Sequence, residues 1–317
     1  MKTRSKRPAA QNGAASAEAP PAPAPESAPP AVLPTTGTLA GAPAAAGAVG
    51  RVAWVQAALR SDVGQNRGEN QDSVFALTTL LPSAAGDAPV PFGFFAVADG
   101  MGGLADGATA SRTAINLVAE RVLSELLVPA VRGQGGSGGQ ATVAEILEAA
   151  LVRAGQTIHQ AARAAGAPSG TTFSGAVLLG RQLVTAHVGD SRIYLLGPDE
   201  LRLLTQDHSI VARLIAMGQF SPEDARNNPQ RNVLYRSLGQ TANVEVESAS
   251  HAWRGYSHLL LCSDGLWDQV ADAELAEILR GHANIDSAAD HLVRLANERG
   301  GPDNISAIVV RLPEAAA

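Results

Sequence analysis

The chain has 317 residues, of which 45% are hydrophobic and 17% charged, and its formal net charge is -6. This composition is typical of a globular protein, and the acidic balance argues against nucleic acid as the main partner, because phosphate backbones are bound through an excess of Lys and Arg. The single cysteine, Cys262, excludes an intrachain disulfide and indicates a reducing compartment. We therefore expect a cytoplasmic protein in which Cys262 is a small buried strand residue.

The first fifty residues differ from the rest of the chain. Ala, Pro and Gly dominate residues 9–50, and no apolar periodicity typical of a helix or a strand occurs there. The basic start is not followed by an apolar segment of signal-peptide type, and no apolar run is long enough to span a membrane. We predict a disordered arm over residues 1–50, one domain over residues 51–313, and no membrane partner.

Beyond the arm, the apolar periodicity alternates between blocks of strands and pairs of helices. The predicted strands cover Val52–Leu59, Ser73–Leu81, the apolar run that ends at Asp99, Phe173–Leu179, Leu183–Val188, Arg192–Leu196, Leu201–Leu204, Val244–Ala249, His258–Cys262 and Ile305–Leu312. The predicted helices cover Ala105–Leu127, Thr142–Ala165, Asp272–Arg280 and Ile285–Glu298, with a polar, partly helical insertion at Ser209–Arg231. This pattern indicates an α+β fold, a four-layer α-β-β-α sandwich of two antiparallel sheets flanked by helical pairs.

Two of the apolar strands end in the same way. The segment FFAVADG delivers Asp99 to a strand end that is followed by glycine, and LLLCSDG does the same with Asp264. Asp303 precedes the last strand and Asp72 begins an early one. A lone Asp-Gly pair after a strand usually forms only a turn, but four acids in such positions predict a cluster at one edge of the sheets, which needs cations to stay charged.

Oxygen ligands of this kind select Mg²⁺ or Mn²⁺ over zinc. Two such ions activate a water and hold a phosphoryl oxygen, so that hydrolysis needs no protein nucleophile. The other phosphate-cleaving chemistries are disfavoured. A thiolate route needs an Arg six positions after Cys262, where the chain has Asp268, and neither GxxxxGK[ST] nor HExxH occurs.

Seven segments resemble the motifs of a known family, in the family's order. They are RGENQD (67–72), VADGMGG (97–103), SGTT (169–172), VGDSR (188–192), LTQDHS (204–209), CSDGLWD (262–268) and GGPDNIS (300–306). On these segments the chain resembles a PPM-family protein phosphatase, the metal-dependent serine/threonine class, in its bacterial form. The resemblance extends over residues 60–311 and implies a central β-sandwich flanked by helices.

The resemblance also implies a set of metal ligands for two ions, Mn²⁺ or Mg²⁺. By the family pattern Asp99 bridges both ions and the carbonyl of Gly100 coordinates beside it. Asp264 and Asp303 complete the shell of the first ion, and Asp72 acts on the second, directly or through water.

The same pattern gives roles to Arg67, which binds the substrate phosphate, and to Asp190, which holds a third, weaker ion. Arg67, Asp72 and Asp99 are thus the implied catalytic residues. A guanidinium suits phosphate because it offers paired donors. Without the resemblance, Arg67 reads as a solvated loop residue and Asp190 as a hairpin turn residue.

Three positions depart from frequent family patterns. Gln71 stands where many members have Glu, Met101 stands where animal members have a His proposed as general acid, and Leu104 replaces a His frequent in bacterial members. The proton donor to the leaving group is therefore unassigned. We interpret His208 as a packing or hydrogen-bonding residue, and Thr171 with Thr172 as structural.

The resemblance thus implies an enzyme that hydrolyses phosphoserine and phosphothreonine in proteins and opposes a bacterial Ser/Thr kinase. Its expected partners are phosphorylated proteins, with a cognate kinase and the substrates of that kinase. The segment Ser209–Arg231 falls where bacterial relatives carry a flap, which favours this reading. One alternative is a catalytically inactive sensor or binding module of the same fold. Another is a phosphatase acting on a sigma-factor regulatory protein. We expect a monomer.

Overall fold

The computed structural model describes residues 54–83, 88–134, 141–221 and 228–312. These residues belong to the unit Val49–Ala317. The predicted arm over residues 1–50 lies outside the described residues. Within the described ranges, no helix combines the length and the apolar composition that crossing a lipid bilayer requires.

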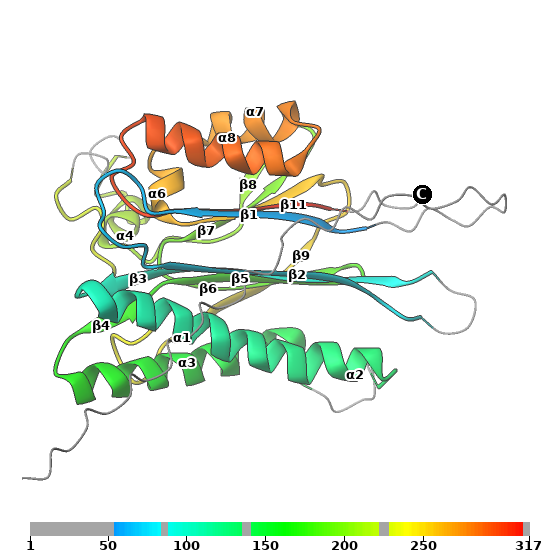
Figure 1. Ribbon diagram of the computed structural model, residues 1–317, viewed down its shortest axis with the longest axis horizontal. Coiled ribbons are helices and arrows are strands. Elements are labelled where there is room, and N and C mark those ends of the chain that lie inside the picture. Colours follow the sequence, from blue (N-terminus) through cyan, green and yellow to red (C-terminus); the bar gives the residue numbers. More distant parts are fainter. Residues whose placement is uncertain (1–53, 84–87, 135–140, 222–227, 313–317) are drawn as a thin grey trace, which may run out of the picture. The chain divides into compact units, whose positions relative to one another are not determined.

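Two antiparallel sheets form the centre of the fold (Figure 1). The first has the order β1-β11-β10-β7-β8 and consists of β1 (Gln56–Asp62), β7 (Arg192–Leu196), β8 (Leu201–Leu203), β10 (His258–Cys262) and β11 (Ile305–Arg311). The second has the order β2-β3-β5-β6-β9 and consists of β2 (Asp72–Leu81), β3 (Val90–Gly102), β5 (Phe173–Leu179), β6 (Gln182–Val188) and β9 (Glu247–Ala252), with β4 (Ser169–Thr171) paired to the end of β3.

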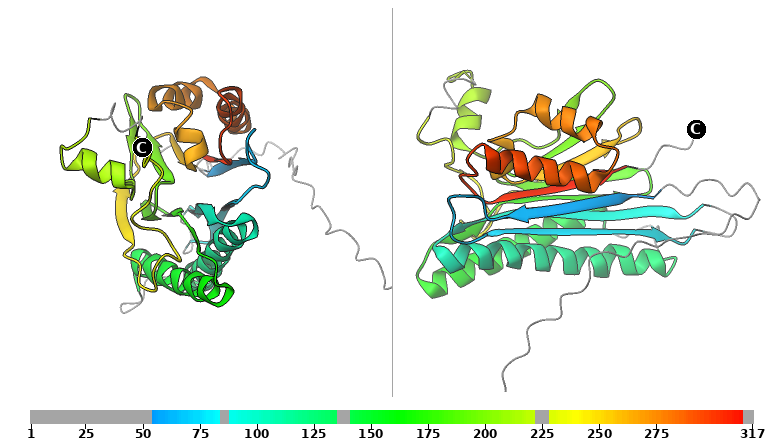
Figure 2. Two further views of the ribbon diagram at one scale, coloured as in Figure 1. Left: turned by 90° about the vertical axis from the view of Figure 1, so that its left-hand side faces the viewer. Right: turned by 45° about the horizontal axis from the view of Figure 1, so that its top comes forward.

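Helices cover the outer face of each sheet, and the end-on view in Figure 2 shows the two helical layers on opposite sides. The second sheet is covered by α1 (Leu104–Val122) and α3 (Val143–Ala165), and the first by α7 (Asp272–Gly281) and α8 (Ile285–Glu298). Shorter helical segments are η1 (Leu123–Leu127), α2 (Val128–Val131), α4 (Ile210–Ala216) and α6 (Asp264–Trp267). The predicted four-layer α+β sandwich is confirmed.

The period-two alternation of strand side chains divides the core into three layers. In β3, Phe94 and Ala96 pack toward the helices, whereas Phe95 and Val97 pack between the two sheets. In β10, Leu260 belongs to the layer beneath α7 and α8, while its neighbours face the other sheet. Each inner strand therefore buries both faces, which explains the nearly continuous apolar runs.

The structure corrects the sequence prediction at a few elements. The last strand of the second sheet is Glu247–Ala252 rather than Val244–Ala249, because Val244 and Val246 pack against the helix-side core instead of entering the sheet. The helix predicted over Ala105–Leu127 ends at Val122, where a π-helical turn follows. The short elements β4 and α6 were not predicted, since three or four residues carry no periodicity.

The loop between β1 and β2 lies at the same end of the sheets as α6 (Figure 1), and the side chain of Asn304 holds it there. Asn304 Nδ2 donates hydrogen bonds to the carbonyl oxygens of Val63 (2.9 Å) and Glu69 (3.0 Å), and its Oδ1 accepts one from the Gln71 N–H (2.8 Å). Asn304 is buried, so its amide is satisfied by these three backbone groups of the loop.

We expect Asn304→Ala to lower the free energy of unfolding by roughly 2 to 4 kcal/mol, because three hydrogen bonds that hold the loop are lost. Urea unfolding measures the change. The exposed Asn243 provides the control, Asn243→Ala, which should leave stability within about 0.5 kcal/mol of the wild type. Equal stability of the two variants would show that Asn304 does not hold the loop.

Candidate active site

Asp72 and Asp99 face each other across the antiparallel pair formed by β2 and β3. Along β3, Phe95 and Val97 point between the sheets, and Asp99 continues this series. Along β2, Val74 packs into the same layer, and Asp72, two residues earlier, lies on the same face of the strand. Directly opposed residues of one face are close neighbours, and like charges in such pairs are unfavourable. The two carboxyl groups therefore meet between the sheets, at the end of the sandwich core.

Asp264 begins α6 just after β10, and Asp303 lies just before β11, the strand that pairs with β10. The carboxyl of Asp264 is within hydrogen-bonding reach of Asp99. Burial raises the pKa of Asp99 well above its usual range, and four further carboxyls, those of Asp72, Asp264, Asp190 and Asp303, raise it more. The structure thus brings all five predicted acidic residues into one electrostatic cluster, centred on Asp99.

The other carboxyls of this cluster are also shifted. Burial raises the pKa of Asp72 to about 6, although hydrogen bonds from the hydroxyls of Ser306 and Ser263 act in the opposite direction. Burial, followed by the charges of Asp303 and Asp72, raises the pKa of Asp264 to about 7. Both residues thus carry their charge at a free-energy cost that a neighbouring cation would remove.

The oxygen atoms of the cluster fit a divalent cation chemically. Asp72 Oδ1 and Asp264 Oδ1 are buried without a hydrogen-bond partner, and unpartnered carboxylate oxygens are the ligands that Mg²⁺ and Mn²⁺ prefer. In the described part of the chain, however, no group of three or more His, Cys, Asp or Glu has ready ligand geometry. Ser263 Oγ donates a hydrogen bond to the other oxygen of Asp72, Oδ2 (2.7 Å), which leaves Oδ1 as the unpartnered oxygen of this carboxylate.

Arg67 lies in the loop between β1 and β2, with a half-exposed side chain. Its Nη2 donates to Asp303 Oδ2 at 2.6 Å, and this hydrogen bond raises the pKa of the guanidinium. The structure therefore places Arg67 at the exposed side of the acidic cluster, next to one of the predicted ligands. Its predicted contact with a substrate phosphate stays a prediction.

Asp190 lies in the turn between β6 and β7 and is 6% exposed. His208 forms two hydrogen bonds with Gly189, the residue that precedes Asp190 in this turn. The Gly189 N–H donates to His208 Nδ1 (3.0 Å), and the His208 N–H donates to the Gly189 carbonyl (2.7 Å). His208 Nε2 lies 3.1 Å from Arg236 Nη1 and 3.4 Å from Glu247 Oε2. Because both ring nitrogens have protein neighbours, the geometry agrees with a hydrogen-bonding role.

The glycines that follow Asp99 and Asp264 allow backbone segments to approach closely. A Cβ on Gly100 would collide with the carbonyl oxygens of Gln71 and Gly107, and a Cβ on Gly265 would collide with that of Asn304. Gln71 and Asn304 are the chain neighbours of two other site acids. Each Asp-Gly pair thus packs against the backbone beside another acid, and metal coordination by the Gly100 carbonyl stays a prediction.

Two residues hold the acids in place: Thr172, which the sequence indicated as structural, and Ser263, which the sequence reasoning did not select. Thr172 donates its backbone N–H to the Asp99 carbonyl (2.8 Å), and its Oγ1 accepts from the Asp99 N–H (2.9 Å). Ser263 donates to Asp72. The signal was available, because Ser263 and Thr172 lie inside quoted motifs, but a motif does not say which atom a side chain contacts.

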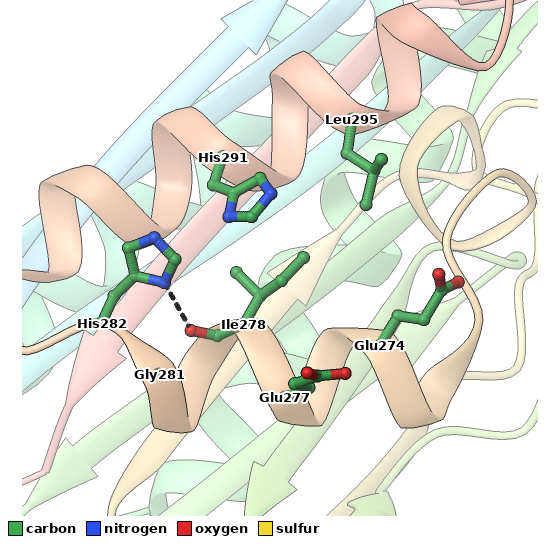
Figure 3. A pocket seen from close by; sticks show the side chains of 7 residues that line it. All are labelled: Glu274, Glu277, Ile278, Gly281, His282, His291 and Leu295. Carbon is green, nitrogen blue, oxygen red and sulfur yellow. Dashed lines mark hydrogen bonds between the residues drawn. The ribbon is translucent and has the colours of Figure 1, made fainter.

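A cavity on the outer helical layer lies apart from these residues. It lies along α7 and α8 (Figure 3) and is lined by Glu274, Glu277, Ile278, Gly281, His282, His291 and Leu295. None of these is a predicted site residue, and Glu274 forms an ion pair with Arg299. The candidate active site is therefore the acidic cluster between the sheets.

Two antiparallel sheets between helical pairs form the fold of solved bacterial serine/threonine phosphatases, to which this structure is similar. The pattern of the protein phosphatase 2C family matches residues 69–306, and the chain belongs to this family. Its relatives, which match along most of the chain, are serine/threonine phosphatases. The protein is accordingly a protein serine/threonine phosphatase.

The serine/threonine phosphatase stp of Listeria innocua is 35% identical over 258 residues, which cover 81% of this chain and 95% of that protein. Among solved structures, the Mycobacterium tuberculosis phosphatase PstP/Ppp matches with a TM-score of 0.67 and 32% identity, covering 82% of this chain and 99% of that chain. The catalytic domain of PstP in complex with two manganese ions matches with a TM-score of 0.64 and 30% identity, covering 82% and 98%.

The raised pKa of Asp264 predicts an effect on the stability of the metal-free protein. In the folded state its pKa is about 7 against an ordinary 3.8, so stability is present at low pH and is lost as pH rises from 3.8 to about 7. In EDTA at pH 8, Asp264→Asn should therefore be more stable than the wild type, by up to roughly 4 kcal/mol. Near pH 4 the advantage should vanish.

Chemical unfolding across this pH range measures the difference. The control is Asp199→Asn, a change at an exposed residue, which should follow the wild type at every pH. If Asp264→Asn is less stable than the wild type at pH 8 in EDTA, burial of the charge is not costly and the electrostatic description of the cluster is wrong.

Proposed function

We propose that this phosphatase hydrolyses phosphoserine and phosphothreonine in proteins with two divalent ions, Mn²⁺ or Mg²⁺, held by the acidic cluster. The observation that carries the proposal is the mutual effect of the buried carboxyls on the pKa of Asp99. Asp99 would hold both ions, with the Gly100 carbonyl as a further ligand, Asp264 and Asp303 would hold the first, and Asp72 would act on the second, directly or through water. The complex of PstP with two manganese ions supports this choice of metal.

When bound, the ions would neutralise the carboxylates, polarise the phosphoryl group and make a water nucleophilic near neutral pH. The chain's own residues supply position and charge. The backbone of Asp99 is fixed by Thr172, and the loop that precedes Asp72 is fixed by Asn304. Rigid placement matters because a nucleophile held in line with the phosphorus avoids much of the entropic cost of the reaction.

Arg67 is the proposed anchor for the substrate phosphate. Its side chain is half-exposed at the cluster and its guanidinium remains charged at any pH of interest. A planar guanidinium binds two phosphate oxygens through parallel hydrogen bonds, which orients the phosphorus as well as attracting it. Asp303 accepts a hydrogen bond from Arg67 in the structure, and this bond would orient the guanidinium toward the phosphate.

Asp190 is the proposed ligand of a third, weaker ion. The charge of Asp264 contributes, after burial, to raising the pKa of Asp190, so a cation between the two carboxyls would be favourable to both. Arg192, two residues later, acts in the opposite direction and stabilises the charged form. A nearby fixed positive charge reduces the need for a cation, which agrees with weaker binding than at the two main ions.

The proposed substrates are proteins phosphorylated by a bacterial Ser/Thr kinase, which this enzyme would oppose. The segment between β8 and β9 supports a role in choosing among them. It begins with α4 at the end of the sandwich that carries the acids (Figure 2), and Arg231 forms an ion pair with Asp268 directly after α6 (3.1 Å). We also propose that residues 51–313 form the phosphatase domain, since the family match and both sheets fall within them.

Removal of metal should abolish activity. We expect hydrolysis of para-nitrophenyl phosphate and of a phosphothreonine peptide to require added Mn²⁺ and to stop in EDTA. Asp99→Asn should lower kcat at least 100-fold, because the charge that holds both ions is lost, while Asp199→Asn at an exposed position should keep wild-type rates. Turnover that persists in EDTA would overturn the mechanism, and a folded protein without turnover in Mn²⁺ would favour the inactive sensor.

Arg67→Lys should raise the KM for the phosphopeptide by about tenfold and lower kcat less, because the charge remains while one of two parallel hydrogen bonds is lost. Arg67→Ala should raise KM further. Steady-state kinetics with Arg181→Lys as the surface control tests this. An unchanged KM in Arg67→Ala would show that the arginine does not bind the phosphate.

A further inference from the structure

The short helix α6 carries one site acid at its start and contacts another through its last residue. Asp264 begins the helix, and Trp267 ends it. The indole Nε1–H of Trp267 donates a hydrogen bond to the backbone carbonyl of Asp190 at 2.9 Å. One helical turn therefore links the carboxyl of Asp264 to the backbone that carries the carboxyl of Asp190.

A second contact fixes the plane of the indole. The guanidinium carbon of Arg192 lies 3.6 Å from the centroid of the Trp267 ring, a cation–π geometry that strengthens when the pair is shielded from water. Arg192 is itself immobilised, since its Nε and Nη2 donate to both carboxylate oxygens of Asp207 (3.0 and 2.7 Å) and its Nη1 donates to Tyr194 Oη (3.1 Å).

Both contacts come from one stretch of chain, because Asp190 and Arg192 are two residues apart at the turn between β6 and β7. Trp267 is thus held at its N–H and at its ring face by the same segment. The turn has independent support from His208 through Gly189, so removing one contact leaves the fold in place. The two Trp267 contacts therefore set the distance between α6 and the turn that carries Asp190.

We propose that Trp267 is a positioning residue that fixes Asp190 relative to Asp264 and thereby sets the affinity of the cation site that these two carboxylates share. The inference rests on the proposed assignment of Asp190 as a ligand of the third ion. Trp267 contacts the carbonyl of Asp190 and not its carboxylate, which leaves the carboxylate oxygens available to the ion. Without the two contacts of Trp267, Asp190 and Asp264 would be free to move apart.

The test compares Trp267→Phe, Asp190→Asn and the double variant in titrations with Mn²⁺ alone, counting free Mn²⁺ by electron paramagnetic resonance. Trp267→Phe keeps an aromatic ring against Arg192 but removes the N–H donor. It should weaken the weakest Mn²⁺ three- to tenfold, the range expected for one hydrogen bond, and leave the two tighter ions within twofold. Asp190→Asn should lose the weakest ion, and the double variant should match Asp190→Asn, because Trp267 acts through Asp190.

Trp253→Phe is the matched control, since Trp253 is buried in the layer between the sheets and its Nε1 has no hydrogen-bond partner among the described residues. It should bind Mn²⁺ as the wild type does. A second measurement uses the wild-type protein alone and so does not depend on the folding of any variant. The indole N–H resonance of Trp267 in the wild type should shift in Mg²⁺ with the affinity of the weakest ion.

The outcomes separate the two claims. If Asp190→Asn loses the weakest ion while Trp267→Phe binds as the wild type, the positioning role is wrong and the Asp190 site stands. If Asp190→Asn binds every ion as the wild type does, the Asp190 assignment is wrong, and the inference with it. Uniform weakening of all ions in Trp267→Phe would indicate a general structural role and would also overturn the inference.

Discussion

The structure depends on one electrostatic constraint: several carboxyl groups are held close together between two sheets, where their negative charges are poorly solvated. The acid centred among them, Asp99, has its pKa raised by burial and by each of its acidic neighbours. Such an arrangement costs free energy in the absence of cations and returns it when they bind. The scaffold therefore favours the binding of divalent cations, which agrees with the proposed hydrolysis by an activated water.

The sandwich creates this constraint through ordinary strand geometry. Alternation along β2 and β3 turns Asp72 and Asp99 into the space between the sheets, where their apolar predecessors form a core. Glycine after each strand-end acid then allows another acid-bearing segment to pack against it. Because the apolar layer and the acids share one face, the rigidity of the core is transmitted to the site.

The sequence was sufficient for the architecture and for the acids, since apolar runs ending in Asp-Gly mark buried strand ends and the motifs occur in family order. It was insufficient where a single tertiary contact decides the outcome. Nothing in the pattern of Asn304 says that its amide joins β11 to the loop before β2, nor that Trp267 reaches the Asp190 carbonyl. The ion pair of Arg67 with Asp303 likewise joins residues 236 positions apart, which periodicity cannot reveal.

The most direct test of the central claim is anomalous diffraction from crystals soaked in Mn²⁺, because it counts the ions and identifies their ligands in one experiment. The account predicts two strong peaks that share Asp99, one also contacting Asp264 and Asp303 and the other on the side of Asp72, with a weaker third peak at Asp190. Well-ordered crystals with no anomalous peak in contact with Asp99 would contradict it.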